Sequence, residues 1–337
     1  MTGNYIGAAR VELLLEQYFP KELQEDVLQC VNHLDNGLNS LQEIRCRVHK
    51  PLFLRCAQGK EIQAIDNVSS KQMRYMVNRI SQGSVYAWEE EFRRGYLTLP
   101  GGCRVGLTGK TVLEQGQIHT LTHINGLNFR IARAVSGAAD ILMPLLYEGD
   151  HIRNCLLVSP PGGGKTTMLR DMVRQLSDGV TVLGKPGYTV AVVDERSEIA
   201  GCIQGIPQMD VGCRTDVLDG CSKSEGIRMV IRAMAPQIIA VDEIGTEADV
   251  QALEEASESG VAVFATAHGI SIEGLYRHPV LYKLVKGGYF TLIVFLHWHL
   301  GQVVSEIYLR AGGGGYEAVR YYSDDWGRQR YGFLQSV

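Results

Sequence analysis

The feature that most restricts the fold of this chain is a glycine-rich segment that follows an apolar run and opens a helical pattern. Its residues are Ser159, Pro160, Pro161, Gly162, Gly163, Gly164, Lys165, Thr166 and Thr167. A strand, a glycine-rich loop and a helix, in that order, are typical of a nucleotide phosphate loop. Glycines let consecutive backbone N–H groups turn toward phosphate oxygens, and the helix N-terminus adds partial positive charge. We therefore expect these nine residues to bind the phosphates of a nucleotide.

Three side chains of this segment have distinct expected roles. We expect the Lys165 amine to reach the β- and γ-phosphates and the Thr166 hydroxyl to be a ligand of Mg²⁺. Ser159 stands where phosphate loops usually carry their first glycine. The residue at that position mainly forms the turn that follows the strand, so we expect a loop with Ser159 there still to bind nucleotide.

An acidic pair follows the apolar run 238–241. The pair is Asp242 and Glu243, and an apolar strand followed by two acids is the pattern of a Walker B segment. We expect Asp242 to hold Mg²⁺, directly or through water, and Glu243 to orient or deprotonate the attacking water. The alternative interpretation is a solvated strand end, which the phosphate loop upstream disfavours.

A second acidic pair and a histidine occupy comparable positions. The run 189–193 is followed by Asp194 and Glu195, and His268 follows the run 261–266. The carboxyl ends of parallel strands face the crevice in which ligands bind. Glu195 could instead be a solvated strand end, and a histidine in such a place can be purely structural. We keep both as candidates, with His268 as a donor that could sense the γ-phosphate.

The second half of the chain alternates short apolar runs with helical patterns. The apolar runs lie at 156–158, 189–193, 238–241, 261–266 and 290–296. Helical patterns lie between several of them, at 166–176, 224–234, 247–259 and 271–284. This alternation predicts an α/β domain with a parallel sheet covered on both faces.

The first part of the chain has a different pattern. Two helices are expected to meet at Pro20, and Ser69 with Gln72 predicts a capping box that opens a helix through residue 80. A second helix is predicted over 85–94. Strands separated by turn residues are expected at 44–48, 52–55, 96–99, 105–107, 117–122 and 129–131. We predict an α+β domain over residues 1–140 and the larger domain over 141–337.

Composition narrows the function classes. The chain has 337 residues, of which 45% are hydrophobic, and its net charge is −4, from 33 basic and 37 acidic side chains. These values exclude a disordered chain and give no global reason to expect nucleic-acid binding. The eight cysteines include no C-x-x-C pair, which favours reduced thiols in the cytoplasm. The longest apolar run, 290–300, is too short to span a bilayer and contains two histidines, so we expect no integral membrane segment.

The motifs together resemble those of the secretion ATPases of type II and type IV systems. In that superfamily they are called the Walker A, Asp, Walker B and His boxes, and here they lie in order at 159–167, 194–198, 241–245 and 265–269. The sporulation branch, which acts in the mother cell of endospore-forming bacteria, is the most similar. Its likeness is carried by residues 99–106, 127–133, 193–201, 207–216 and 220–226. Asp242 departs from the many secretion ATPases that carry glycine there.

The resemblance implies a RecA-like P-loop motor that uses ATP and Mg²⁺. It makes Glu195 the Asp-box acid, Glu243 the Walker B acid and His268 the His-box residue. It also implies a hexameric ring docked on integral membrane proteins of a channel complex, with nucleotide between the two domains. Arginines from outside the motor core complete such sites. The candidates here are Arg130 and Arg133, with Arg196 and Arg214 as alternates.

Three functions remain open from the sequence. The leading one is an ATPase in the cytoplasm of the mother cell, peripheral to a membrane complex that it powers during sporulation. A RecA-like motor acting on nucleic acid would need a basic strip or an aromatic platform, whereas the basic clusters at 45–47 and 93–94 are small. A scaffold that only binds ATP is disfavoured because Lys165, Asp242 and Glu243 are all present.

Overall fold

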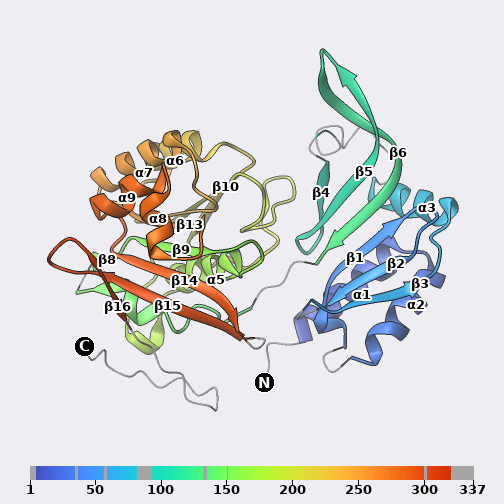
Figure 1. The fold of residues 1–337 in the computed structure, drawn as a ribbon, viewed down its shortest axis with the longest axis horizontal. Helices are drawn as coiled ribbons and strands as arrows, with labels where there is room; N and C mark the ends of the chain where they lie inside the picture. The colour runs from blue at the N-terminus through green and yellow to red at the C-terminus, as the bar shows by residue number, and fades with distance from the viewer. Residues whose placement is uncertain are drawn as a thin grey trace. The chain divides into compact units, whose positions relative to one another are not determined.

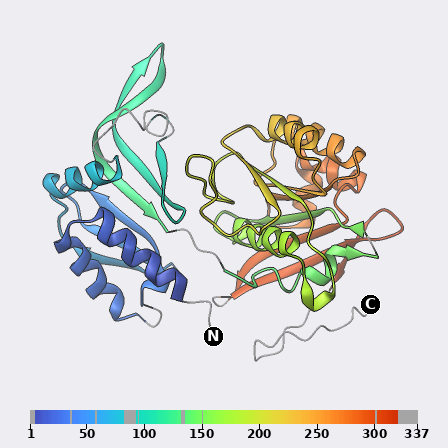
Figure 2. The ribbon, with the colours of Figure 1, turned by 180° about the vertical axis from the view of Figure 1, so that it is seen from behind.

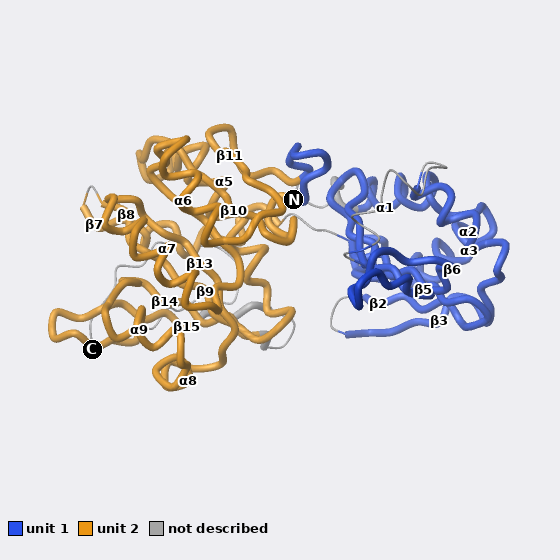
Figure 3. Tube along the Cα trace, turned by 90° about the horizontal axis from the view of Figure 1, so that it is seen from above, with its two compact units in different colours: residues 1–133, 201–208 blue, residues 134–200, 209–337 orange. Residues whose placement is uncertain are grey.

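The structure is a computed structural model that describes residues 5–34, 37–56, 59–81, 93, 95–131, 135–149, 151–299 and 302–319 (Figure 1). The chain divides into two compact units, coloured separately in Figure 3. Unit 1 comprises Met1–Arg133 and Gly201–Gln208, and unit 2 comprises Ala134–Ala200 and Met209–Val337. The sequence gives no sign that residues 201–208 group with unit 1. The domain boundary at 140/141 stays a prediction.

Unit 1 is an α+β structure. Its helices are α1 (Tyr5–Tyr18), α2 (Lys21–Asn32) and α3 (Ser70–Ile80), with a 3₁₀ turn at Gly37–Ser40. Its strands are β1 (Leu41–Arg47), β2 (Leu52–Cys56), β3 (Glu61–Ile65), β4 (Tyr96–Leu99), β5 (Cys103–Glu114) and β6 (Gln117–Arg130). Over the described residues these strands form one antiparallel sheet in the order β3-β2-β1-β6-β5-β4.

Several local predictions for unit 1 are confirmed. Pro20 is the N-cap of α2, with a φ of −66°, so α1 ends before it and α2 begins after it. Ser69 and Gln72 form both bonds of the capping box at the start of α3. The core lies between the helices and the sheet, where the rings of Phe19 and Phe129 approach to 4.6 Å between centroids. The predicted helix over 85–94 lies almost entirely outside the described residues.

Unit 2 holds the longer sheet. Its strands are β7 (Tyr147–Glu148), β8 (His151–Ile152), β9 (Cys155–Ser159), β10 (Val190–Asp194), β11 (Thr215–Asp219), β12 (Ile238–Val241), β13 (Ala262–His268), β14 (Leu292–His299), β15 (Gln302–Arg310) and β16 (Tyr316–Val319). Its helices are α5 (Lys165–Asp178), α6 (Lys223–Met234), α7 (Glu247–Glu258), α8 (Ile272–Arg277) and α9 (Leu281–Gly287), with 3₁₀ turns at Met143–Leu146 and Thr181–Leu183.

The main sheet of unit 2 is mostly parallel, as predicted. Within the described part of the chain its order is β11-β10-β12-β13-β9-β14-β15-β16, and only the pairs β14–β15 and β15–β16 are antiparallel. Strand β9 therefore lies between β13 and β14 near the middle of the sheet. The register places His268 of β13 beside Ser159 of β9, so the two strands end together.

Helices cover both faces of this sheet (Figures 1 and 2). Leu156 and Val158 of β9 belong to one apolar cluster with residues of α6, α7, α8 and α9. Side chains alternate along a strand, so the residues between them point to the opposite face, against which α5 packs. The strands buried on both faces account for the continuous apolar runs in the sequence.

The structure differs from the predicted elements in several places. The strands expected at 105–107, 117–122 and 129–131 are two long strands, β5 and β6, and the short strands β7 and β8 lie where no strand is predicted. Strand β11 lies in a segment that we did not predict to be a strand, because Thr215–Asp219 mixes polar and apolar residues at the edge of the sheet. The helix predicted over 271–284 is two short helices, since the proline at 279 cannot continue the first. Strand β3 was also not predicted.

In the described ranges, no helix has both the length and the apolar character needed to cross a bilayer.

Candidate active site

The phosphate loop joins β9 to α5, as the sequence predicts. Gly162 and Gly164 have φ values of +75° and +93°, in the left-handed region that favours glycine, and Gly164 is the N-cap of α5. A Cβ on Gly163 would lie far inside van der Waals contact of the Ser159 side chain. The buried Ser159 hydroxyl donates to the Pro160 carbonyl at 2.8 Å. The serine that departs from the pattern therefore supports the turn from inside the loop.

Lys165 is held at the base of this loop. Its amine lies 3.1 Å from the Ser159 carbonyl oxygen and 3.2 Å from Nδ1 of His268, and the residue is buried. Burial lowers the pKa of Lys165, whereas the nearby carboxylates of Asp242 and Glu243 raise it. The amine thus lies near the two acidic residues that follow β12, at the edge of the sheet where ligands bind in open α/β folds.

Two hydroxyl groups bond to the carboxylate of Asp242. Thr166 Oγ1 donates to Oδ2 at 2.8 Å, and Thr266 Oγ1 of β13 donates to Oδ1. Thr166 and Asp242 give the pair of hard oxygen atoms that suits Mg²⁺ next to a phosphate loop. No cluster of three or more histidine, cysteine or acidic side chains that could hold a metal occurs among the described residues. Such a cluster is not needed for Mg²⁺, which is usually held by one or two carboxylates, substrate phosphates and water.

The carboxylate of Glu243 has a partner on each oxygen. Oε1 lies 3.0 Å from Nε2 of His268, and Oε2 lies 2.9 Å from Nη1 of Arg196. The His268 ring therefore connects Glu243 to Lys165 through its two nitrogen atoms. The arrangement fits the neutral tautomer in which Nε2–H donates to Glu243 and Nδ1 accepts from Lys165.

The loop after β10 is fixed from two sides. Asp194 is buried, and its carboxylate accepts from the backbone N–H groups of Glu198, Ile199 and Ala200 at 2.8–3.0 Å. Burial raises the pKa of Asp194, and these backbone bonds lower it. Arg170 of α5 donates to the Ile199 and Glu198 carbonyls at 2.5 and 2.6 Å. Asp194 thus organises the loop rather than facing the phosphate loop.

Within unit 2, two candidate residues lie outside this cluster, Glu195 and Arg214. Glu195 forms an ion pair with Lys223 of α6, so its carboxylate is engaged away from Lys165. Arg130 is exposed in unit 1, 3.9 Å from Glu43. Arg133 lies outside the described residues. Arg214 donates to the Ser177 carbonyl at 2.8 Å and is not part of the cluster around Glu243.

The structure adds two residues, Arg170 and Thr266, for which the sequence alone predicts no role. Only Thr266 carries a weak signal, because it is a polar residue within an otherwise apolar run. Thr266 interrupts the apolar run of β13 and lies two residues before His268, on the same face of the strand. Arg170 is buried on α5 together with both polar and apolar residues, so the sequence pattern does not single it out. Arg196 was named only as an alternate arginine.

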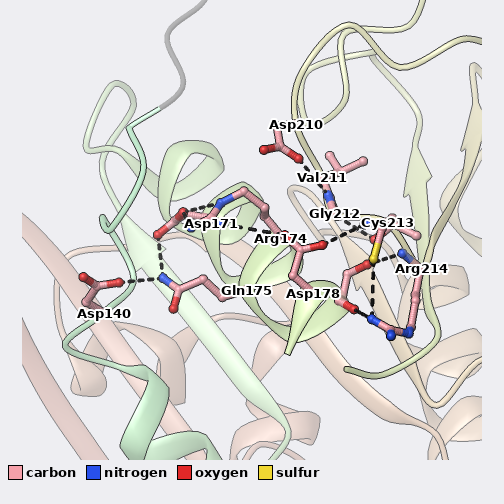
Figure 4. Close-up of polar contacts among 12 residues, drawn as sticks. Asp140, Asp171, Arg174, Gln175, Asp178, Asp210, Val211, Gly212, Cys213 and Arg214 are labelled. Carbon is pink, nitrogen blue, oxygen red and sulfur yellow. Dashed lines mark hydrogen bonds and ion pairs between the residues drawn. The ribbon is translucent and has the colours of Figure 1, made fainter. Parts of the chain in front are cut away.

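A second polar network lies further along α5 (Figure 4). Asp171 is buried and accepts from the Ala139 N–H, from Gln175 and from Arg174, at 2.8–3.0 Å. Gln175 also donates to Asp140 at 2.7 Å, and the Asp178 carboxylate accepts from the Cys213 N–H at 2.9 Å. These bonds tie the helix that begins with Lys165 to the segments on either side of it.

We expect Asp171→Ala to lower the free energy of unfolding of this protein by about 3 kcal/mol, because it leaves buried donors without their acceptor. Urea denaturation followed by circular dichroism measures the change. Glu247→Ala is the matched control, since it removes an exposed ion pair with Lys283 and should change stability by less than about 1 kcal/mol. Equal midpoints for the two variants would contradict a structural role of the Asp171 network.

Solved structures share the architecture. The ATPase DotB of Legionella pneumophila superposes with a TM-score of 0.60 at 13% identity, covering 88% of this chain and 83% of that one. The pilus retraction motor PilT with bound ADP superposes with a TM-score of 0.50 at 14% identity, covering 87% and 80%. At these identities the likeness shows the fold, which is that of a P-loop secretion ATPase with an N-terminal domain.

Sequence comparison identifies closer relatives. The Stage III sporulation protein AA of Bacillus subtilis (strain 168) is 41% identical over 273 residues, which make up 81% of this chain and 88% of that protein. The family model described as "Sporulation stage III, protein AA" matches residues 19–313. The match includes the phosphate loop and all the residues around Glu243. The chain therefore belongs to the Sporulation stage III, protein AA family.

Proposed function

We propose that this protein is a Mg²⁺-dependent ATPase of the secretion type that powers a membrane-associated channel or transport complex during endospore formation. The observation that carries the proposal is the meeting of Lys165, Thr166, Asp242, Glu243 and His268 at one edge of a parallel sheet. Each of these side chains has the chemistry that hydrolysis of a nucleoside triphosphate requires. Family membership supports the place of this activity in sporulation.

In this proposal the phosphate loop binds the triphosphate and the acidic residues act on water. The Lys165 amine leaves the Ser159 carbonyl and donates to phosphate oxygens. Thr166 and Asp242 would hold Mg²⁺, and the ion would supply neutralisation of the phosphate charge. Glu243 accepts a proton as the water oxygen bonds to the γ-phosphorus and the bond to the β–γ bridging oxygen breaks. The products are ADP and inorganic phosphate.

The proposed assembly is a hexameric ring that acts in the mother cell on integral membrane proteins. Its support is the fold shared with DotB and PilT and the match to a sporulation family. Arg130 and Arg133 are the arginines proposed to complete the site from outside the motor core. Glu195 remains the proposed Asp-box acid, and release from Lys223 would free its carboxylate for that role.

Variants of Lys165 and Glu243 should separate binding from hydrolysis. Lys165→Ala should weaken ATP binding by about 10- to 100-fold, because a charge-assisted hydrogen bond to phosphate is lost. Glu243→Gln should leave binding within a fewfold of wild type and lower kcat by about 10²–10⁴-fold, as loss of a general base does. Fluorescent-nucleotide titration and phosphate release measure the two quantities.

The exposed pair Glu247 and Lys283 offers matched controls for these variants. Glu247→Gln and Lys283→Ala repeat the same chemical changes on the same unit, away from the phosphate loop, and should match wild type. Hydrolysis at one common rate in wild type, Lys165→Ala and Glu243→Gln would show that this site is not the source of the activity.

The proposed ring predicts a nucleotide-dependent change in size. Light scattering coupled to size exclusion should give a hexamer in the presence of Mg²⁺ and a non-hydrolysable ATP analogue, since nucleotide is proposed to lie between domains that contact neighbouring subunits. Lys165→Ala should remain at the size of the nucleotide-free protein. A monomer under both conditions, at concentrations well above the measured Kd for nucleotide, would contradict assembly driven by nucleotide alone.

A further inference from the structure

Arg196 makes a contact that the role expected of it does not explain. An arginine that completes the active site of a neighbouring subunit is expected to make no bond within the active site of its own chain. In the structure, Nη1 of Arg196 lies 2.9 Å from Oε2 of Glu243 in the same chain. The Arg196 side chain is 61% exposed and that of Glu243 is 26% exposed, so the pair lies at the mouth of the site, open to solvent on the arginine side.

The backbone that carries Arg196 is fixed with respect to β12. Strands β10 and β12 are parallel neighbours, with Val193 paired to Val241, so the residues that follow them leave the sheet side by side. The turn after Asp194 is held by three backbone N–H bonds to that buried carboxylate and by the two bonds from Arg170. The backbone from which the Arg196 side chain extends toward Glu243 is therefore held in place.

The backbone of Glu243 is in an unusual conformation. Its φ is +52°, in the left-handed region that is unfavourable for a residue other than glycine. Its N–H donates to Thr266 Oγ1 at 2.8 Å, which keeps the backbone in place. Among the described residues, the carboxylate bonds to Arg196 through one oxygen and to His268 through the other. Each carboxylate oxygen has two lone pairs, so both can keep these bonds while one oxygen accepts a proton from water.

We infer that Arg196 is a positioning residue for Glu243 of its own subunit. Together with His268 it fixes the direction of the carboxylate, so that a free lone pair is aimed at the water next to the phosphate. Without Arg196 the carboxylate keeps one partner and can rotate. The inference rests on the proposed function, and it assigns Arg196 a role within one chain instead of one across a subunit interface.

Steady-state kinetics of Arg196→Ala test this role. Misalignment of a reacting group can lower the reaction rate by about 10²-fold, so kcat of Arg196→Ala should fall by roughly 10- to 100-fold. The Kd for an ATP analogue should stay within twofold of wild type. Arg196→Lys should recover part of kcat, because an ammonium can donate to one carboxylate oxygen. Arg232→Ala is the control, since Arg232 is an exposed arginine of α6 bonded to the Arg228 carbonyl, and it should behave like wild type.

The double variant tells a positioning role from direct contact with phosphate. If Arg196 acts through Glu243, Arg196→Ala should not slow the Glu243→Gln enzyme further in single-turnover experiments. A further drop of tenfold or more, or a matching loss of nucleotide affinity, would overturn the inference in favour of phosphate binding by Arg196.

Mixed subunits tell action within a chain from action across an interface. Lys165→Ala subunits retain Arg196, and Arg196→Ala subunits retain the phosphate-binding lysine. Mixing the two should not restore activity if Arg196 serves its own subunit. Restored activity above the sum of the separate variants would overturn the inference.

An NMR measurement addresses the same role without turnover. In nucleotide-free protein, the imidazole ¹⁵N shifts of His268 should change in Arg196→Ala, because the carboxylate bonded to Nε2 moves, and should not change in Arg232→Ala. Unchanged shifts would overturn the inference.

The failure of the proposed function and the failure of the positioning role give different results. A wild type that binds ATP but does not hydrolyse it would contradict the proposed function alone. An Arg196→Ala variant as fast as an active wild type would contradict the positioning role alone.

Discussion

The parallel pairing of β9, β13 and β12 is the constraint on which the candidate active site depends. Lys165 bonds to a histidine 103 positions later in the chain, and Thr166 bonds to an aspartate 76 positions later. Neither contact could form unless the three strands ended at one edge. The register provides this, because His268 is opposite Ser159 and Val241 is opposite Ala265. The pattern of strand ends thus determines which side chains meet.

The parts of this arrangement that the sequence predicts are those with a strong local signal. Strand β9, the glycine-rich loop and α5 follow directly from residue order, and Ser69 with Gln72 marks the start of α3. The acidic pair after β12 is equally clear, and the structure brings its members to Lys165 and Thr166. In each case a few neighbouring residues carry the information.

What the sequence does not predict depends on contacts between distant residues. Glu195 and Asp194 form one acidic pair in the sequence, yet one binds Lys223 and the other binds the backbone of its own loop. Strand β11 is a strand only because β10 supplies its hydrogen bonds. The bond between Arg196 and Glu243 requires knowledge of which strands are neighbours, and hydrophobic periodicity alone does not give the order of strands in a sheet.

The two hydrogen bonds from Arg170 to the loop after β10 have a consequence for how this protein can vary. Arg170 lies one helical turn after Thr166 on α5, so the helix that presents the phosphate loop also holds the segment that carries Arg196. In the proposed function, affinity for nucleotide and rate of turnover are therefore linked through one helix. Mutations in α5 that alter nucleotide affinity should alter turnover as well, and natural variants that tune only one of them are expected to change residues elsewhere.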